Sequence, residues 1–325
     1  MTNFQVYRKT LLFSIVEFLI GLVALAILVG CCTAGFFIMN NSTDKAIIGL
    51  VIGLVIGIIL VVLINIFITN RIKAAQIGMM AKGVVDGKLP DNIFKEGLAE
   101  VRGRFAKLTL FFMVMGAIKG MFRQLGRAIN KLGTAVGGQV GDSVTSVIDS
   151  AIQIVIGYLA DCCLGWVMYN KKKGVAEAAC EGAVIFFKRG KTLIINIGRI
   201  FGLGLLSLVV IGGALFGLGY LILKNFPNMF VTLGNEIQEI ANRNGSTAPD
   251  FVTNPTLLTI YVAALGAVIL WSMIHSLLIR PFILVGVLRN FMKAGLEEKI
   301  SNSDFDTLES KSPRFAKMRK SISAS

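Results

Sequence analysis

The stretch Leu193–Leu223, LIINIGRIFGLGLLSLVVIGGALFGLGYLIL, decides the fold class of this chain. Its only charged residue is Arg199, which lies near one end. About 20 consecutive apolar residues are enough to cross the hydrocarbon core of a bilayer, so this stretch is longer than one crossing needs. The sequence therefore predicts a transmembrane helix here.

Glycines recur in this stretch at spacings that favour close helix contacts. Glycine costs stability in a soluble helix, but in a membrane the GxxxG spacing lets two helix backbones approach closely. The segment 46–69 carries a second stripe with the same spacing. The glycines for which we predict a helix-packing role are Gly49, Gly53, Gly57, Gly198, Gly202, Gly213 and Gly217.

The composition extends this prediction to the whole chain. Hydrophobic residues make up 54% of the 325 residues, and the mean hydropathy is +0.73. The net charge of +14 would indicate nucleic-acid binding in a soluble protein. Here Lys and Arg in the cytoplasmic loops of a membrane protein account for it, so we expect no nucleic-acid partner.

The apolar segments predict an all-α, polytopic transmembrane helix bundle with about six spans and cytoplasmic amphipathic helices. Residues 1–300 form the transmembrane domain, and the polar residues 301–325 are expected to be a disordered cytoplasmic tail. The polar segment 70–107 is expected to be cytoplasmic, with a turn at Gly87 between short amphipathic helices. The predicted spans lie near 11–39, 46–69, a broken or short span within 108–150, 151–170, 193–223 and 256–279.

The crossing within 108–150 has two interpretations. In one, Leu108–Arg123 crosses, although its apolar part has only about half the length of a span. In the other, the Gly/Ser-rich stretch Leu132–Ser150 crosses as a broken helix. The second is favoured, because the first places a basic stripe on the wrong side of the membrane.

The orientation follows from the basic residues. The segments 1–10, 70–107, 171–191 and 280–325 hold 25 of the 33 Lys and Arg residues, whereas the expected external loops 40–45 and 224–256 hold three. Cytoplasmic loops collect Lys and Arg, so both termini are predicted to be cytoplasmic.

Two carboxylates inside predicted spans are candidates for an ion or substrate pathway. Asp161 lies about 13 Å from the cytoplasmic end of its helix at the helical rise, and Glu17 is shallower. Such residues are costly in a bilayer unless they face protein, water or a cation. Tyr158 lies one turn before Asp161 and joins the candidate set. The alternative is a structural Asp161 that is protonated or paired with Lys or Arg.

A basic stripe indicates contact with the membrane surface. Its residues recur every fourth position beside apolar side chains, as in a helix that lies on anionic lipid headgroups. The stripe consists of Lys119, Arg123, Arg127 and Lys131.

Motifs of catalysis and metal binding are missing from the sequence. There is no GxSxG, HExxH or Walker A motif, and the five cysteines include no CxxC pair. We therefore expect neither an enzyme, nor a cofactor, nor a metal site.

From Leu132 to Leu223 the chain has a Gly/Ser-rich helix start, paired cysteines, a short amphipathic segment and a basic turn before a glycine-containing helix. The residues that form this pattern are Leu132, Gly133, Gly137, Gly138, Gly141, Cys162, Cys163, Ala183–Phe187 and Lys191–Gly198. A proline-led last helix begins at Pro255. This order of features resembles the choline transporter-like family. The resemblance implies an α-helical transporter for choline-like or other organic cations.

Two functions are consistent with these features. The first is a transporter or channel-like protein for a small cation or choline-like solute, with Asp161 and Glu17 on the pathway. The second is a non-catalytic membrane scaffold or a subunit of a larger complex. Its glycine-faced helices would then bind partner helices in a homo- or hetero-oligomer.

Overall fold

The computed structural model describes residues 1–38, 43–105, 116–120, 124, 142–243, 245, 247 and 249–323, and every element in these ranges is a helix. The α-helices are α1 (Asn3–Ile38), α2 (Thr43–Ile64), α3 (Asn70–Val85), α4 (Ile93–Arg104), α6 (Asp142–Tyr169), α7 (Val175–Lys188), α8 (Gly190–Ser207), α9 (Gly213–Leu223), α10 (Pro227–Arg243), α11 (Asp250–Thr253), α12 (Pro255–Ile274), α13 (Arg280–Glu297), α14 (Asn302–Lys311) and α15 (Pro313–Ser323). Three π-helical segments join successive α-helices: η1 (Asn65–Thr69), η2 (Leu208–Gly212) and η3 (His275–Ile279).

Within the described residues, four helical stretches are long and apolar enough to cross a membrane. In the most apolar part of each stretch, most residues are not buried by the rest of the protein, as expected for surfaces that face lipid. The chain is all-helical in its described ranges and fits an integral membrane protein. The four stretches are Asn3–Ile38, Ile48–Val85, Gly198–Leu223 and Pro255–Glu297.

The described residues contain four stretches long enough to span a membrane, so the six spans predicted from the sequence stay a prediction. The described apolar part of the 151–170 segment, Gln153–Tyr169, is shorter than the four long stretches. Its second half is buried by other helices, with Leu164 and Val167 almost fully enclosed. Most of 108–150 lies outside the described residues, so the two interpretations of that crossing stay open.

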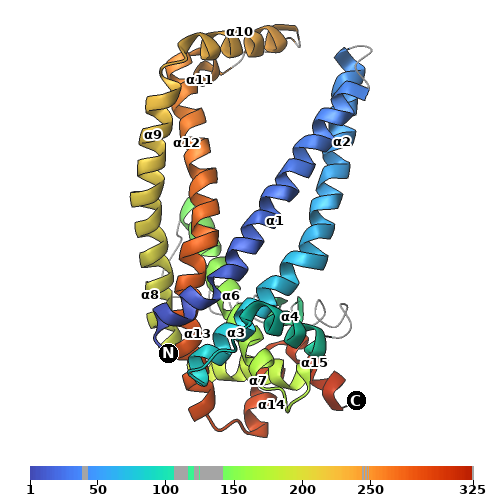
Figure 1. Ribbon diagram of the computed structural model, residues 1–325, viewed down its shortest axis with the longest axis vertical. Helices are drawn as coiled ribbons and strands as arrows, with labels where there is room; N and C mark the ends of the chain where they lie inside the picture. The colour runs from blue at the N-terminus through green and yellow to red at the C-terminus, as the bar shows by residue number, and fades with distance from the viewer. Residues whose placement is uncertain are drawn as a thin grey trace. The chain divides into compact units, whose positions relative to one another are not determined.

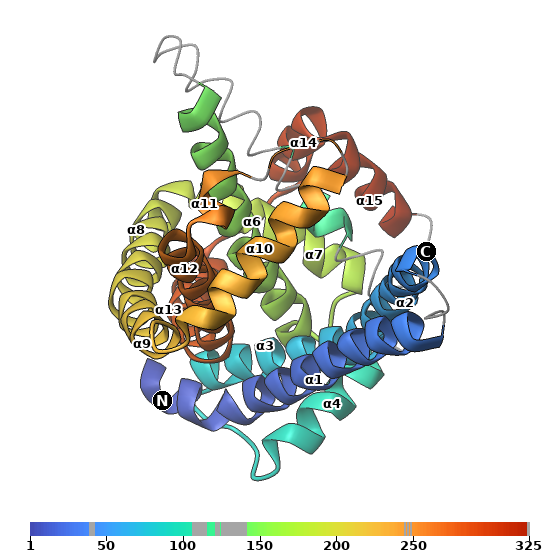
Figure 2. The same cartoon turned by 90° about the horizontal axis from the view of Figure 1, so that it is seen from above.

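The chain divides into two units. Unit 1 comprises Met1–Ile200 and Pro281–Ser325, and unit 2 comprises Phe201–Arg280. In unit 1, α1 and α2 form a long hairpin whose helices lie side by side (Figures 1 and 2). A Cβ atom added at Gly53 would lie 2.1 Å from the Cys31 carbonyl oxygen, and one added at Gly35 equally close to that of Gly49. The two backbones touch because these residues have no side chain.

The exposure of apolar side chains changes along α2, η1 and α3. On α2, Val55 and Ile59 are each about half exposed, as suits a lipid-facing helix. On α3, Ile77, Met79 and Met80 are completely buried. The π-helical segment η1 lies between the two environments, and such segments usually occur as single turns inside longer α-helices.

This burial corrects part of the interpretation of residues 70–107. The predicted turn is present, because Gly87 adopts a φ of 67° between α3 and α4. However, α3 is not a solvated amphipathic helix. It packs against α1, α4 and α6 and forms the centre of unit 1. Small residues such as Ala74 and Ala75, both fully buried, let the surrounding helices come close.

The C-terminal residues also differ from the sequence prediction. Instead of a disordered tail, residues 302–323 form α14 and α15, which pack against α7. The segment is polar overall, but Leu308 and Phe315 gather on one side and are buried. Ser301 and Asp304 form a capping box that starts α14, because each side chain accepts a hydrogen bond from the other residue's backbone.

In unit 2, α9 and α12 lie side by side and α10 crosses their end (Figure 1). The helix α12 begins at Pro255, and the Asn254 side chain accepts hydrogen bonds from the first free backbone N–H groups of the helix. The Trp271 indole N–H donates to Ser207 Oγ at 3.3 Å. This hydrogen bond joins α12 to the end of α8.

Candidate functional site

The carboxylate of Asp161 is enclosed within unit 1. Its side chain is 1% exposed, and its Oδ1 lies 3.0 Å from Nζ of Lys73 on α3. The lysine side chain is 27% exposed, so the partner of the buried carboxylate is itself only partly buried. The sequence leaves open whether a structural Asp161 is protonated or paired with Lys or Arg, and the structure contains the pair with Lys73.

The approach of α3 to α6 sets the geometry of this pair. A Cβ atom added at Gly78 would lie 3.2 Å from the side chain of Met168. Contacts advance together along both helices, from Lys73 with Asp161 to Gly78 with Met168. The two helices are therefore parallel. Because Gly78 has no side chain, they can approach closely enough for a direct ion pair.

A buried hydrogen-bond network joins α3 to α1 one helical turn away from this pair. Gln76, one turn after Lys73 on α3, donates from Nε2 to Ser14 Oγ at 2.6 Å and to the Thr10 carbonyl oxygen at 3.2 Å. All three polar side chains of this network are buried. Buried polar groups must be satisfied by partners, so the network fixes how α1 and α3 pack against each other.

The register of α1 and α3 places Glu17 at the level of Lys73. The helices are antiparallel, because Gly83 on α3 faces Val6 whereas Gln76 faces Ser14. Glu17 lies one turn after Ser14, and Lys73 lies one turn before Gln76. Since Glu17 Oε1 is also buried, the fold gathers both candidate carboxylates and one lysine from three helices at one level of unit 1.

Tyr158 and the paired cysteines line α6 around Asp161. Tyr158 is 4% exposed and lies one turn before Asp161. Cys162 and Cys163 are fully buried, and Cys163 Sγ donates to the Ala179 carbonyl oxygen of α7. The latter cysteine therefore serves the contact between α6 and α7. All five cysteines are free thiols.

The remaining candidates have different positions. Lys119 is exposed, whereas the other three residues of the basic stripe, Arg123, Arg127 and Lys131, lie outside the described residues. Among the described residues no group of three or more His, Cys, Asp and Glu is arranged to hold a metal ion.

The cluster around Asp161 consists of the Lys73–Asp161 pair, Glu17, Tyr158 and the Gln76 network. Four of its residues were not singled out from the sequence: Lys73, Gln76, Thr10 and Ser14. The available signal was the three-residue spacing of Lys73 and Gln76, which places two polar groups on one face of an otherwise small-residue helix. That spacing does not show which helix lies opposite. No protein-family model, curated protein or solved structure matches this chain.

Proposed function

We propose that this protein is a membrane transporter or channel-like protein for a small cation, with Asp161 as the carboxylate that binds it. The observation that carries the proposal is the pairing of a fully buried carboxylate with a lysine that is only partly buried. A buried carboxylate needs a positive partner. An incoming cation or proton that replaces the Lys73 ammonium group would maintain that balance, and Lys73 would resume its place after the cation leaves.

The solute class follows from the resemblance to the choline transporter-like family. A choline-like cation carries the same single positive charge as the lysine that it would replace. Tyr158 lies one turn from Asp161 and supplies an aromatic ring of the kind that attracts quaternary ammonium groups. Glu17 would add negative charge at the same level. The proposal also includes the cytoplasmic location of both termini, the remaining crossings within 108–170 and the absence of enzymatic activity.

The test is uptake of labelled choline, other organic cations and inorganic cations into proteoliposomes. We expect Asp161→Asn to abolish uptake and Glu17→Gln to reduce it. Lys73→Gln removes the ammonium group that competes with the cation for Asp161. We therefore expect it to change the KM for the cation with little effect on folding. Glu239→Gln is the matched control, because Glu239 is an exposed carboxylate on α10. Wild-type rates for Asp161→Asn would refute the role of this carboxylate.

The second candidate is a non-catalytic scaffold or a subunit of a larger membrane complex. It is favoured by the glycines of α9: within the described structure no atom lies within 4 Å of a Cβ atom added at Gly213 or Gly217. Such a surface suits a partner helix in a homo- or hetero-oligomer. Copurification of a stoichiometric partner in mild detergent, lost on Gly217→Leu, together with no uptake of any cation, would favour this function.

A further inference from the structure

A separate cavity of about 520 Å³ lies at the C-terminal ends of α3 and α6. It is lined by residues of α3, α4, α6 and the turn 170–173, all in unit 1. The lining residues are Gly78, Lys82, Asp86, Glu100, Met168, Tyr169, Asn170, Lys171, Lys172 and Lys173. None of them belongs to the cluster around Asp161.

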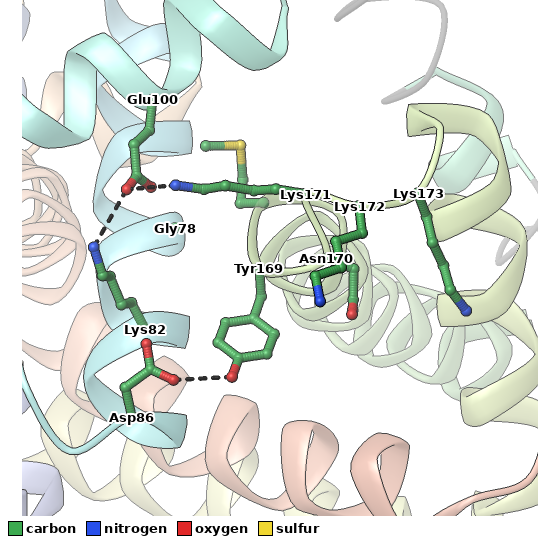
Figure 3. A pocket seen from close by; sticks show the side chains of 10 residues that line it. Gly78, Lys82, Asp86, Glu100, Tyr169, Asn170, Lys171, Lys172 and Lys173 are labelled. Atoms are coloured by element: carbon green, nitrogen blue, oxygen red, sulfur yellow. Dashed lines mark hydrogen bonds and ion pairs between the residues drawn. The ribbon is translucent and has the colours of Figure 1, made fainter.

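One carboxylate in this cavity is shared by two lysines. Lys171 Nζ lies 2.7 Å from Glu100 Oε1, and Lys82 Nζ lies 3.5 Å from the same oxygen. Figure 3 shows the two lysines reaching Glu100 from different elements. Two ammonium groups thus face one carboxylate, which leaves one positive charge unbalanced at this point.

The other charged groups of the cavity do not remove this excess. The Tyr169 hydroxyl donates to Asp86 Oδ1 at 2.9 Å, so this carboxylate is satisfied by a neutral donor. Lys173 points away from the other groups (Figure 3) and pairs with Glu181 outside the cavity. The lining then contains three lysines, Lys82, Lys171 and Lys172, and two carboxylates, Asp86 and Glu100, which leaves a surplus of one positive charge.

Arg104 offsets the partial negative charge at the C-terminal end of α6, which would otherwise repel an anion in this cavity. The C-terminus of a helix is partially negative, because its last carbonyl groups lack partners within the helix. Arg104 donates hydrogen bonds to the carbonyl oxygens of Val167, Asn170 and Lys171 at the end of α6. It neutralises this end and also fixes the turn that carries the lysines.

From this arrangement we propose that the cavity binds a phosphate-bearing anion. Two lysines held by a shared carboxylate are already oriented, so a phosphate oxygen that approaches them gains charge-assisted hydrogen bonds at little entropic cost. The wall formed by Met168 and the Tyr169 ring leaves room for the organic part of the ligand. The phosphate can belong to a lipid headgroup or to a soluble metabolite.

Two probes with the same phosphomonoester distinguish these sources. Glycerol 3-phosphate is titrated into the purified full-length protein, and the protein is reconstituted into phosphatidylcholine nanodiscs with and without phosphatidic acid. Binding of glycerol 3-phosphate supports a soluble ligand. Binding only of phosphatidic acid supports a lipid headgroup. Either affinity should fall as the salt concentration rises.

Three variants establish whether the cavity is responsible. Lys171→Gln and Lys82→Gln should each weaken binding about tenfold, which corresponds to the loss of one charge-assisted hydrogen bond. Glu100→Gln should strengthen binding, because it removes the carboxylate that competes with phosphate for both lysines. Lys293→Gln is the control, since Lys293 is highly exposed on α13 and outside the cavity.

Misfolding would weaken binding in every variant. The expected increase in affinity for Glu100→Gln therefore distinguishes a specific effect from misfolding. The proposal is overturned if the wild type binds neither probe, or if Lys171→Gln and Lys82→Gln bind like the wild type. It is also overturned if Glu100→Gln loses affinity while its thermal unfolding is unchanged.

Discussion

The α1/α2 hairpin of unit 1 and the α9/α12 pair of unit 2 use similar glycine patterns in different ways. In the hairpin, an added Cβ atom at Gly53 would lie 2.1 Å from a backbone oxygen of α1. On α9, an added Cβ atom at Gly213 or Gly217 would meet no atom within 4 Å in the described structure. Glycine spacing therefore makes a close helix contact feasible, but it does not create the partner.

The environments of the side chains also differ between the two units. Unit 1 encloses the Lys73–Asp161 pair and the Gln76 network within packed helices. In unit 2 the long helices expose large apolar side chains such as Leu205, Val209 and Leu265. Unit 1 thus combines a compact core of packed helices with a long apolar hairpin, whereas the long helices of unit 2 expose most of their apolar surface.

The largest expected effect is at the backbone contact of the hairpin. Gly53→Ala adds a Cβ atom where a carbonyl oxygen already lies, so α1 and α2 must separate. Overpacking of this kind typically costs about 1–3 kcal/mol, and a backbone neighbour cannot move aside as a side chain does, so we expect about 3 kcal/mol. Thermal or SDS-induced unfolding of the detergent-solubilised protein measures it. Unchanged stability would show that the hairpin is not packed as described.

The next effect concerns the buried ion pair. Lys73→Met leaves Asp161 buried without the lysine, and removal of one partner from a fully buried pair costs about 3–5 kcal/mol. Because Lys73 is 27% exposed, we expect a smaller loss of about 1–2 kcal/mol. Asp161→Asn in the same chain should restore part of it, and a double-mutant cycle measures the coupling. Additive effects would show that the pair contributes no coupling energy.

A smaller effect is expected where the C-terminal helices contact α7. Lys188 bonds to Asp304 at 3.0 Å, and both Lys188 and Arg189 pair with Glu298. The hydrogen bonds from the two cations lower the pKa of Glu298, and the backbone N–H of Ser301, followed by Lys188, lowers the pKa of Asp304.

The sign of the pH dependence follows from these shifts. Since both carboxyl pKa values are lower in the folded state, their contribution is complete above the ordinary values of about 4 and is lost as the pH falls through the lowered ones. The protection of the α14 and α15 amides, which is the intrinsic hydrogen-exchange rate divided by the observed rate at the same pH, should therefore decrease in acid. Lys188→Ala should decrease this protection already at pH 7, whereas Arg243→Ala, which breaks an exposed pair on α10, should not. Equal protection at pH 7 and in acid would contradict this contact.

The smallest effect sharpens the comparison of the two glycine patterns. Gly213→Ala places the same added Cβ atom in open space, so the better helix propensity of alanine should stabilise α9 by less than about 1 kcal/mol. The measurement is the same unfolding experiment as for Gly53→Ala. A large destabilisation would reveal a partner that covers α9, either a second copy of the chain or another helix.

The sequence by itself determined the all-helical fold class and the location of four long apolar segments. An apolar stretch such as Leu193–Leu223 has one stable environment, because backbone groups in lipid must be satisfied within a helix. The Gly87 turn could also be predicted, since a local conformation depends on nearby residues. These features follow from composition and short spacings alone.

Only the tertiary structure decided which polar groups meet. Lys73 and Asp161 are far apart in the sequence, and nothing local to either residue indicates that α3 and α6 pack in parallel. The same reason explains the errors on α3 and on the C-terminal residues. Their burial depends on apolar partners such as Phe315 finding a distant surface, and a polar composition does not reveal that surface. Pairing between distant segments is a property of the folded chain.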